Sequence, residues 1–253
     1  MSNKNTYESS AVVEHYSTVD ELQKPELTIL AKLKGKLKNM KMLDLGVGGG
    51  RTTIYFAELV KEYVGVDYSS SMIDACKKRF SRQENVTFAV ADARDLNAFG
   101  DHSFDFVLFS FNGLDYIDHS DRNKAFGEIK RILKRGGIFV FSTHNIGSLG
   151  QLYAVKYTIN PIKLGWRLFR FCILILLNGL SSHKKDQEWT IINDGAHRFK
   201  LKTHYIKMTY QIRQLSELGF KDIQLYSLED GEEIDMTEVD ERTDPWIYCL
   251  CSI

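Results

Sequence analysis

The sequence predicts an α/β fold, a doubly wound and mostly parallel seven-stranded sheet with an antiparallel final strand and a helical cap insertion. Short apolar runs alternate with helical apolar patterns from residue 42 to about residue 145, which is typical of successive βαβ units. The first of these runs passes at once into a glycine-rich turn and a helix. Such a turn lets a ligand lie against backbone at a helix N-terminus.

Two helices are expected before the sheet. Residues 6–20 carry apolar and aromatic side chains, among them Tyr7 and Tyr16, at positions that favour a short helix. Pro25 suits the first turn of a second helix. The leucines of that helix recur on one face: Leu27, Leu30, Leu33 and Leu37.

The first strand and its turn are the most informative stretch, with the sequence Met-Leu-Asp-Leu-Gly-Val-Gly-Gly-Gly-Arg from residue 42. Dinucleotide sites require G-x-G-x-x-G, whose third glycine lets the helix pack closely on the strand. Gly46 and Gly48 fit that pattern, but Arg51 occupies the third position. The spacing is instead D-x-G-x-G-x-G, beginning at Asp44. It resembles the first motif of the class I S-adenosylmethionine-dependent methyltransferases.

The second and third strands each lead to an acidic residue. Residues 63–67 form an apolar run that ends at Asp67, where a carboxylate can accept hydrogen bonds from two vicinal ribose hydroxyls. Asp67 could instead cap the helix that follows, whose N-cap region spans residues 69–71. Residues 86–90 form the third strand, and Asp92 follows it closely.

The fourth and fifth strands end near the expected substrate. Residues 104–109 open into residues 110–116, which should face the transferred group because ligands of open α/β sheets lie beyond the carboxyl ends of the strands. Asn112 and Asp115 are candidates for orienting a nucleophile there, although Asn-Gly equally suits a tight turn. An amphipathic helix and a Gly-Gly pair precede the fifth strand, residues 138–142, and His144 emerges from its end.

The alternating pattern stops at Ile146. Residues 165–180 are dominated by apolar side chains, but this run is shorter than the roughly 18 residues that spanning a bilayer requires. We expect a helical cap over the active site. A membrane-surface helix or a dimer contact is the alternative, because basic side chains lie beside the apolar run. A final helix, residues 208–218, and two strands, residues 222–226 and 246–251, should close the sheet.

These boundaries divide the chain into four segments. Residues 1–39 are expected to cover the cofactor site, 40–146 to form the Rossmann-like core, 147–204 to form a substrate cap, and 205–253 to supply the closing helix and strands.

The resemblance implies S-adenosylmethionine as cofactor and S-adenosylhomocysteine as product. It places Asp67 on the ribose, Tyr68 and Met72 near the adenine, and the Asp92 carboxylate and Ala93 amide on the adenine ring. An N-terminal tyrosine often covers the cofactor in this family; Tyr16 is the first candidate and Tyr7 the second, although either could simply pack on the edge of the domain. The full set of expected cofactor-binding residues is Tyr16, Asp44, Gly46, Val47, Gly48, Arg51, Asp67, Tyr68, Met72, Asp92, Ala93, Phe109 and Phe111.

Methyl transfer needs mainly a positioned acceptor, because the cofactor carries the activated group. A hydroxyl acceptor also requires a general base, and a histidine with an ordinary pKa near 6.5 suits that role. The catalytic candidates are His144, then His197, with Asn112 as an orienting group. The expected acceptor is an oxygen or nitrogen of a small molecule: a sugar, a natural product or a lipid-linked intermediate.

Composition excludes several partners. Basic and acidic residues number 33 each, and no basic aromatic stripe occurs, which disfavours nucleic acid. The four cysteines are scattered without metal-ligand spacing, so no metal is expected. The polar first residues lack the apolar run of a secretory signal, which favours a cytoplasmic protein. We expect a monomer or homodimer with no transmembrane segment.

Two other classes remain open. A nicotinamide or nucleotide-sugar oxidoreductase shares the first βαβ unit, but Arg51 and the lack of a Tyr-x-x-x-Lys dyad disfavour it. A non-catalytic cofactor-binding protein would keep the same glycine turn and aspartates.

Overall fold

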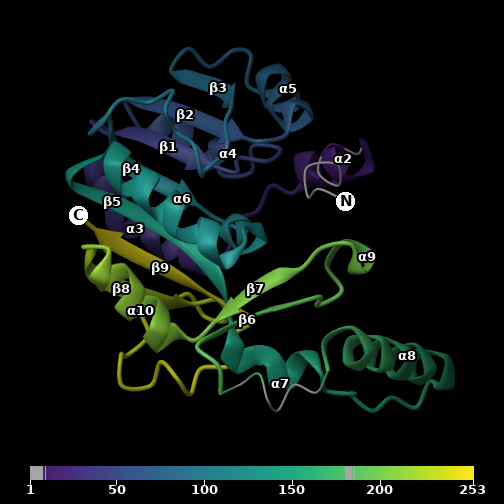
Figure 1. Cartoon of the computed structure of the whole chain (residues 1–253). Coiled ribbons are helices and arrows are strands. Elements are labelled where there is room, and N and C mark those ends of the chain that lie inside the picture. Colours follow the sequence, from purple (N-terminus) through teal and green to yellow (C-terminus); the bar gives the residue numbers. More distant parts are fainter. Residues whose placement is uncertain (1–7, 9, 180–183, 185) are drawn as a thin grey trace.

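A central sheet organises the molecule, with its strands running through the middle of the view in Figure 1. The computed structural model describes residues 8, 10–179, 184 and 186–253, apart from a few side chains. Five parallel strands lie in the order β3-β2-β1-β4-β5, and β9 joins β5 antiparallel, with β8 beyond it. These strands are β1 Lys41–Leu45, β2 Glu62–Asp67, β3 Val86–Val90, β4 Phe104–Phe109, β5 Leu133–Asn145, β8 Lys221–Ser227 and β9 Trp246–Ser252.

The predicted seven-stranded core with an antiparallel final strand is confirmed. Because β9 runs against both neighbours, it separates this sheet from the all-parallel dinucleotide-binding type. Two further strands, β6 Trp189–Ile192 and β7 Thr203–Ile206, were not expected and bring the sheet to nine. Each is only four residues long, so the alternation that marks a strand in a sequence is too brief to recognise.

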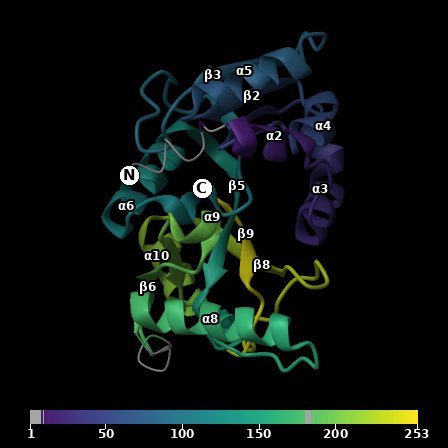
Figure 2. The same cartoon turned by 90° about the vertical axis from the view of Figure 1, so that its right-hand side faces the viewer.

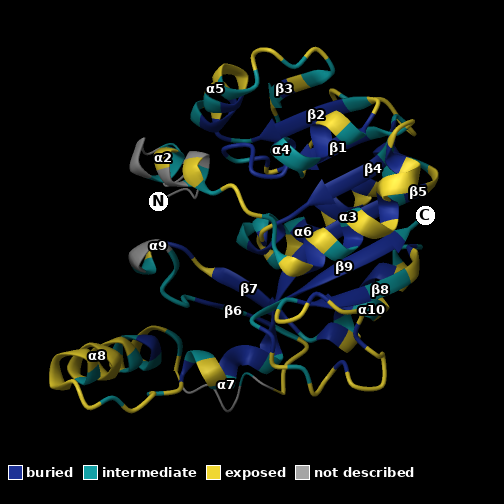
Figure 3. Cartoon of the chain, turned by 180° about the vertical axis from the view of Figure 1, so that it is seen from behind, coloured by how far each residue is buried: buried dark blue, intermediate teal, exposed yellow. Residues whose placement is uncertain are grey.

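Helices cover both faces of the sheet and give it two cores. One core packs α6 (His119–Ile132) and α10 (Met208–Glu217), and the other packs α3 (Lys24–Leu37) and α5 (Ser70–Arg79). Figure 2 shows α6 and α10 on one side of the sheet and α3 on the other. The core strands between these layers are almost wholly buried (Figure 3).

The segments beside the glycine turn differ in detail from expectation. The helix predicted after the turn is a short α4, Thr53–Phe56, continued by a 3-10 turn, Ala57–Leu59. The first N-terminal helix, α2, spans Ser10–Thr18 and is shorter than the predicted 6–20. Tyr7 lies outside the described residues. The second helix begins at Lys24, with Pro25 in its first turn as predicted.

The insertion after β5 contains helices and a hairpin. Its elements are a 3-10 turn Ile146–Ser148, α7 Leu149–Leu152, α8 Pro161–Asn178 and α9 Ala196–Phe199, the last lying between β6 and β7. The expected apolar helix is therefore present, as α8, and the Asn160 side chain caps it by accepting from the Ile162 and Lys163 amides.

The length of β5 explains where the hairpin lies. β5 pairs with β4 only as far as Phe141, and its last residues, His144 and Asn145, pair instead with β7. The antiparallel β6–β7 pair thus extends the sheet beyond the point where β4 ends. This places the hairpin next to the carboxyl ends of the parallel strands, where sheets of this class bind ligands.

Candidate active site

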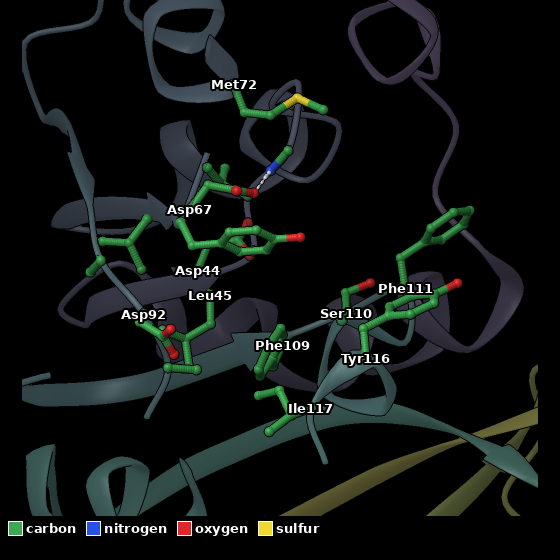
Figure 4. A pocket seen from close by; sticks show the side chains of 18 of the residues that line it. Asp44, Leu45, Asp67, Met72, Asp92, Phe109, Ser110, Phe111, Tyr116 and Ile117 are labelled. Atoms are coloured by element: carbon green, nitrogen blue, oxygen red, sulfur yellow. Dashed lines mark hydrogen bonds between the residues drawn. The ribbon is translucent and has the colours of Figure 1, made fainter. Parts of the chain in front are cut away.

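A cavity of about 1170 Å³ lies at the carboxyl ends of β1 to β4. Its wall includes the glycine turn, the loops after β2, β3 and β4, part of α2, and three residues of the insertion. Figure 4 shows Asp67 and Met72 on one side of it, with Phe109, Phe111 and Tyr116 on another. This volume is at the upper end of small-molecule sites, so the cavity has room for two ligands side by side.

The glycine turn brings bare backbone to the cavity wall. Gly46, Gly48 and Gly50 have φ of +66°, +54° and +84°, a region that side chains with a Cβ rarely adopt. A Cβ on Gly46 would lie 3.1 Å from the Phe109 ring. The Val47 amide donates to the Val66 carbonyl at 3.0 Å and thereby holds the turn against β2.

Asp67 occupies the tip of β2 and lines the cavity. Its carboxylate accepts from the Gly48 amide at 3.0 Å and the Ser69 amide at 2.9 Å, one on each oxygen. Burial raises the pKa of Asp67 above its ordinary value, although these backbone hydrogen bonds oppose the shift. The N-cap of α5 is Ser69 rather than Asp67, so capping this helix does not account for the Asp67 carboxylate at the cavity wall.

Asp92 lies after β3 and is partly exposed. Arg94 pairs with its carboxylate at 2.7 Å, and the Arg94 hydrogen bonds lower the pKa of Asp92. Asp92 and Ala93 both line the cavity, together with all of the other predicted cofactor-binding residues. Those others are Tyr16, Asp44, Gly46, Val47, Gly48, Arg51, Asp67, Tyr68, Met72, Phe109 and Phe111.

Arg51 explains why the third glycine of a dinucleotide motif is missing. Its guanidinium donates to both oxygens of Glu26, at 2.5 and 2.7 Å, and also to Ser110 Oγ at 3.0 Å. It also lies over the Phe111 ring, 4.9 Å from its centre. Arg51 therefore ties α3 to the turn. Glu26, which is buried, went unnoticed in the sequence because a glutamate in an amphipathic helix is ordinarily exposed.

Asp44 is buried below the turn. Its Oδ2 accepts hydrogen bonds from the hydroxyls of Thr52 and Tyr63. Burial raises the pKa of Asp44 to about 6, although these two hydrogen bonds oppose the shift.

His144 forms a buried pair with Asp115. Its Nδ1 and its backbone amide both lie 2.7 Å from Asp115 Oδ2, and Arg122 pairs with the other carboxylate oxygen at 2.7 Å. Burial alone would raise the pKa of Asp115, but the His144 hydrogen bond and the Arg122 charge hold it below its ordinary value. Asp115 is thus a carboxylate, so Nδ1 of a neutral His144 carries the proton and Nε2 holds a free electron pair.

The three catalytic candidates differ in their surroundings. Asp115 lines the cavity, whereas His144 lies behind it, its ring 4.9 Å from that of Tyr205 and 5.7 Å from that of Trp246. Asn112 has a left-handed backbone, which supports the tight turn, and its buried Oδ1 has no hydrogen-bond partner within the described part of the chain. The side chain of His197 lies outside the described residues.

The insertion contributes through its hairpin. Ile191, Lys200 and Lys202 line the cavity, whereas no residue of α8 is among the described lining residues. Ile191 lies on β6, whereas Lys200 and Lys202 lie in the connection between α9 and β7, and none of the three was predicted because the strands of the hairpin are too short to recognise. Among the described residues no cluster of His, Cys, Asp or Glu has the geometry of a metal site, and no helix is long and apolar enough to cross a membrane.

Comparison with known proteins agrees with this geometry. Residues 43–141 match the methyltransferase domain family. A demethylmenaquinone methyltransferase of Staphylococcus aureus strain MRSA252 is 31% identical over 164 residues, which are 61% of this chain and 60% of the relative. The same enzyme from strain JH9 is 28% identical over 206 residues, covering 78% of this chain and 74% of the relative. The chain thus spans about three fifths to three quarters of these relatives.

Solved structures show the same fold. An S-adenosylmethionine-dependent methyltransferase from Mesorhizobium loti superposes with a TM-score of 0.62 at 16% identity, over 90% of this chain and 98% of that one. One from Aquifex aeolicus gives a TM-score of 0.55 at 13% identity, over 95% and 98%. Residues 43–141 thus form a methyltransferase domain, and the sheet order and the glycine turn are those of the class I S-adenosylmethionine-dependent methyltransferases. The predictions of fold, enzyme class and cofactor are confirmed.

Proposed function

We propose that this enzyme methylates a small molecule with an ionisable hydroxyl or amine on an apolar body, and that the Asp115–His144 pair removes the proton. The observation that carries this proposal is the pair itself. It stands at the end of β5, and its carboxylate borders the cavity. The cofactor, when bound, supplies an electrophilic methyl group.

The residues around the cavity fit that cofactor. The glycines of the turn leave room for the methionine portion of the cofactor. The two oxygens of the buried Asp67 carboxylate are proposed to accept hydrogen bonds from its ribose hydroxyls. We assign Tyr68, Met72, Asp92 and Ala93, all of which line the cavity, to the adenine. These assignments are part of the proposal, and so is the cover provided by Tyr16.

The chain's own groups would then act on the acceptor. Asp115 keeps the proton of neutral His144 on Nδ1, which directs the free electron pair of Nε2 away from Asp115. His144 is not among the lining residues, so it would take the acceptor's proton through one bridging water, and the resulting imidazolium would be stabilised by the Asp115 carboxylate. Asn112 lies between the lining residues Phe111 and Gly113 but is not itself among them, so we assign its buried Oδ1 no direct contact with the acceptor.

The hairpin, rather than α8, is proposed to close over the acceptor. Ile191 supplies an apolar contact, while Lys200 and Lys202 supply positive charge at the same wall. The cap assigned to residues 147–204 would therefore have two parts, and within the described part of the insertion the lining residues all belong to the hairpin region, 189–206.

A second candidate is methyl transfer to a ring carbon. The curated relatives are named demethylmenaquinone methyltransferases, and demethylmenaquinone is an apolar ring compound. Removing a proton from a hydroxylated ring raises the nucleophilicity of its carbons as well as of its oxygen. The same His144 base would serve both reactions, and the identity of the methylated atom in the product separates them.

The test is His144→Gln, assayed by transfer of a labelled methyl group to demethylmenaquinone in reduced form, to an amphiphilic sugar and to an amphiphilic amine. We expect kcat to fall at least about 100-fold, because general-base catalysis contributes that much. Cofactor affinity by titration calorimetry should stay within twofold, since His144 does not line the cavity.

His102→Gln is the matched control. His102 is exposed and lies in the turn before β4, and its loss should leave kcat unchanged. If His144→Gln retains full turnover on an accepted substrate, His144 is not the base. The role then passes to His197 or disappears.

A further inference from the structure

Helix α8 presents a wide apolar face to solvent. Ile162, Trp166 and Phe169 are 72%, 68% and 56% exposed, and Leu176 and Leu177 continue the face toward the C-terminal end of the helix. Leu174 is the one fully buried residue among the described residues of α8. Figure 3 shows the helix largely in the colour of exposed residues at the periphery of the molecule.

The exposed apolar side chains share one side of the helix. At about 100° per residue, Ile162, Trp166, Phe169, Leu176 and Leu177 fall within an arc of about 100°. The loop before the helix adds two more apolar side chains, Tyr157 at 81% and Ile159 at 90% exposure. A patch of this kind marks an interaction site.

Basic side chains run along one edge of this face. Lys163, Arg167 and Arg170 lie on the arc next to the apolar one, and all three are exposed. Arg167 and Arg170 also line a shallow hollow with Trp166, Phe169, Ile173 and Phe199. Apolar and cationic groups are thus presented together.

The surrounding sequence is free of negative charge. Residues 129–185 contain no Asp or Glu, although the whole chain carries 33 acidic residues against 33 basic ones. Lys163, Arg167 and Arg170 lie on α8 beside the apolar face, and Arg167 contacts the Lys156 carbonyl in the loop before the helix. Positive charge is therefore concentrated on this part of a protein with no net charge.

We propose that this face of α8 docks on an anionic lipid bilayer, with the helix lying flat in the interface. Trp and Phe side chains suit the headgroup boundary, and Lys and Arg at the edge of the apolar face suit anionic headgroups. A second copy of the chain is a poorer partner, because symmetric pairing of this face would bring the two basic edges together.

The position of α8 gives the docking a consequence for the site. In Figures 1 and 2, α8 and the β6–β7 hairpin lie on the same side of the molecule, and that hairpin lines the cavity. Docking through α8 would therefore hold the hairpin side of the cavity near the bilayer. This inference rests on the helix and does not depend on the acceptor proposed above.

The experiment is co-sedimentation of the full chain with vesicles of phosphatidylcholine alone or with 30% phosphatidylglycerol (a chosen composition on the order of a natural anionic membrane). We expect binding to the anionic vesicles, weakened by salt, and little binding to the neutral ones. Arg167→Gln/Arg170→Gln should weaken it more than about tenfold, since each basic residue near the surface contributes about fivefold.

Trp166→Ala/Phe169→Ala should weaken binding at every salt concentration, because these side chains enter the interface. The matched control is Lys34→Gln/Lys36→Gln, which removes the same charge from exposed positions on α3 and should bind like the wild type. Calorimetric binding of S-adenosylhomocysteine by each variant checks that it is folded, independently of vesicle binding.

Two results would overturn the proposal. One is failure of the folded wild-type chain to bind anionic vesicles. The other is a dimer, seen by light scattering, that Trp166→Ala/Phe169→Ala splits while vesicle binding is absent; the face would then be a contact between copies. Equal binding of the wild type and the Arg167→Gln/Arg170→Gln variant would also contradict the role assigned to charge.

Discussion

At the scale of single residues, burial decides which side chains of the site are chemically unusual. Asp44, Asp67 and Asp115 are all buried beside the cavity, yet their pKa values move in different directions. Asp115 has an arginine and a histidine as partners, whereas Asp44 and Asp67 have only neutral donors. Hydrogen bonds from neutral donors do not offset the loss of water around a buried carboxylate. Asp44 and Asp67 therefore hold a proton more tightly than a carboxylate in water does.

Asp44 predicts a pH dependence of cofactor binding. Because its pKa is about 6, the free enzyme ionises this carboxylate as the pH rises from 5 to 7. The cofactor is cationic, so its affinity should rise over that range and be up to about tenfold weaker at pH 5 than at pH 7. Titration calorimetry across pH 5–8 measures this. Asp44→Asn should abolish the dependence; an unchanged profile in Asp44→Asn would assign it to another group, such as Asp67.

Asp44 also makes folding stability depend on pH, but in the opposite direction: its contribution to the free energy of unfolding is larger at low pH. Its pKa in the folded state lies above the ordinary 3.8, so the folded chain binds the proton more tightly than the unfolded chain. The stabilisation is therefore complete below about pH 4 and is lost as the pH rises through 6. Low pH thus favours the fold at this position while weakening the cofactor site.

At the scale of elements, α3 and the glycine turn are joined by one buried ion pair. The exposed fractions of the Arg51 and Glu26 side chains are 9% and 1%, and Tyr248 and Ser110 also donate to Glu26. Burial alone would lower the pKa of Arg51, but Glu26 raises it. The N-terminal segment is therefore held on the cavity by charge as well as by apolar packing.

Removing one partner of the Arg51–Glu26 pair should lower the free energy of unfolding. We expect Glu26→Gln to lower the free energy of unfolding by about 3 kcal/mol, because it leaves a buried guanidinium without its counter-ion. Glu26→Leu/Arg51→Met should cost less than the sum of the two single changes. Denaturant unfolding measures both.

Glu62→Gln is the control for that prediction. It breaks the partly exposed Lys41–Glu62 pair and should cost less than about 1 kcal/mol. A cost of similar size for Glu26→Gln would mean that the buried pair does not hold α3 in place.

At the scale of the whole molecule, the cavity is assembled from segments far apart in the chain. Residues of α2, the turn, the strand ends and the hairpin all contribute to its wall. A ligand that contacts all of them stabilises the folded state as a unit, since none of these contacts exists in the unfolded chain.

S-Adenosylhomocysteine should therefore raise the thermal midpoint. At 100 times its dissociation constant the gain is about 2.7 kcal/mol, or about 5–10 °C for a chain of this size. Differential scanning fluorimetry measures the shift. Nicotinamide dinucleotide should not raise the thermal midpoint. Asp67→Ala should lose most of the rise caused by S-adenosylhomocysteine. Asp74→Ala, a change at an exposed position on α5, should keep that rise. A shift with the dinucleotide alone would contradict the cofactor assignment.

Much of the fold was evident from local pattern. The glycine turn, the acid at the tip of β2 and the alternation of strand and helix depend on residues close in sequence, and backbone conformation is set over such short spans. The antiparallel final strand was also predicted correctly, but from the resemblance to the methyltransferase family, because its pairing with β5 joins residues more than 100 positions apart. The cofactor followed from these features together.

The pairings within the site required the tertiary structure. Asp115 and His144 are 29 positions apart, and Glu26 and Arg51 are 25 apart. Nothing in the sequence marks either pair, because each meets only when the strands between its members have taken their places in the sheet. The β6–β7 hairpin is the same case: four-residue strands have too few residues to show a period, and their place was decided by the unpaired end of β5.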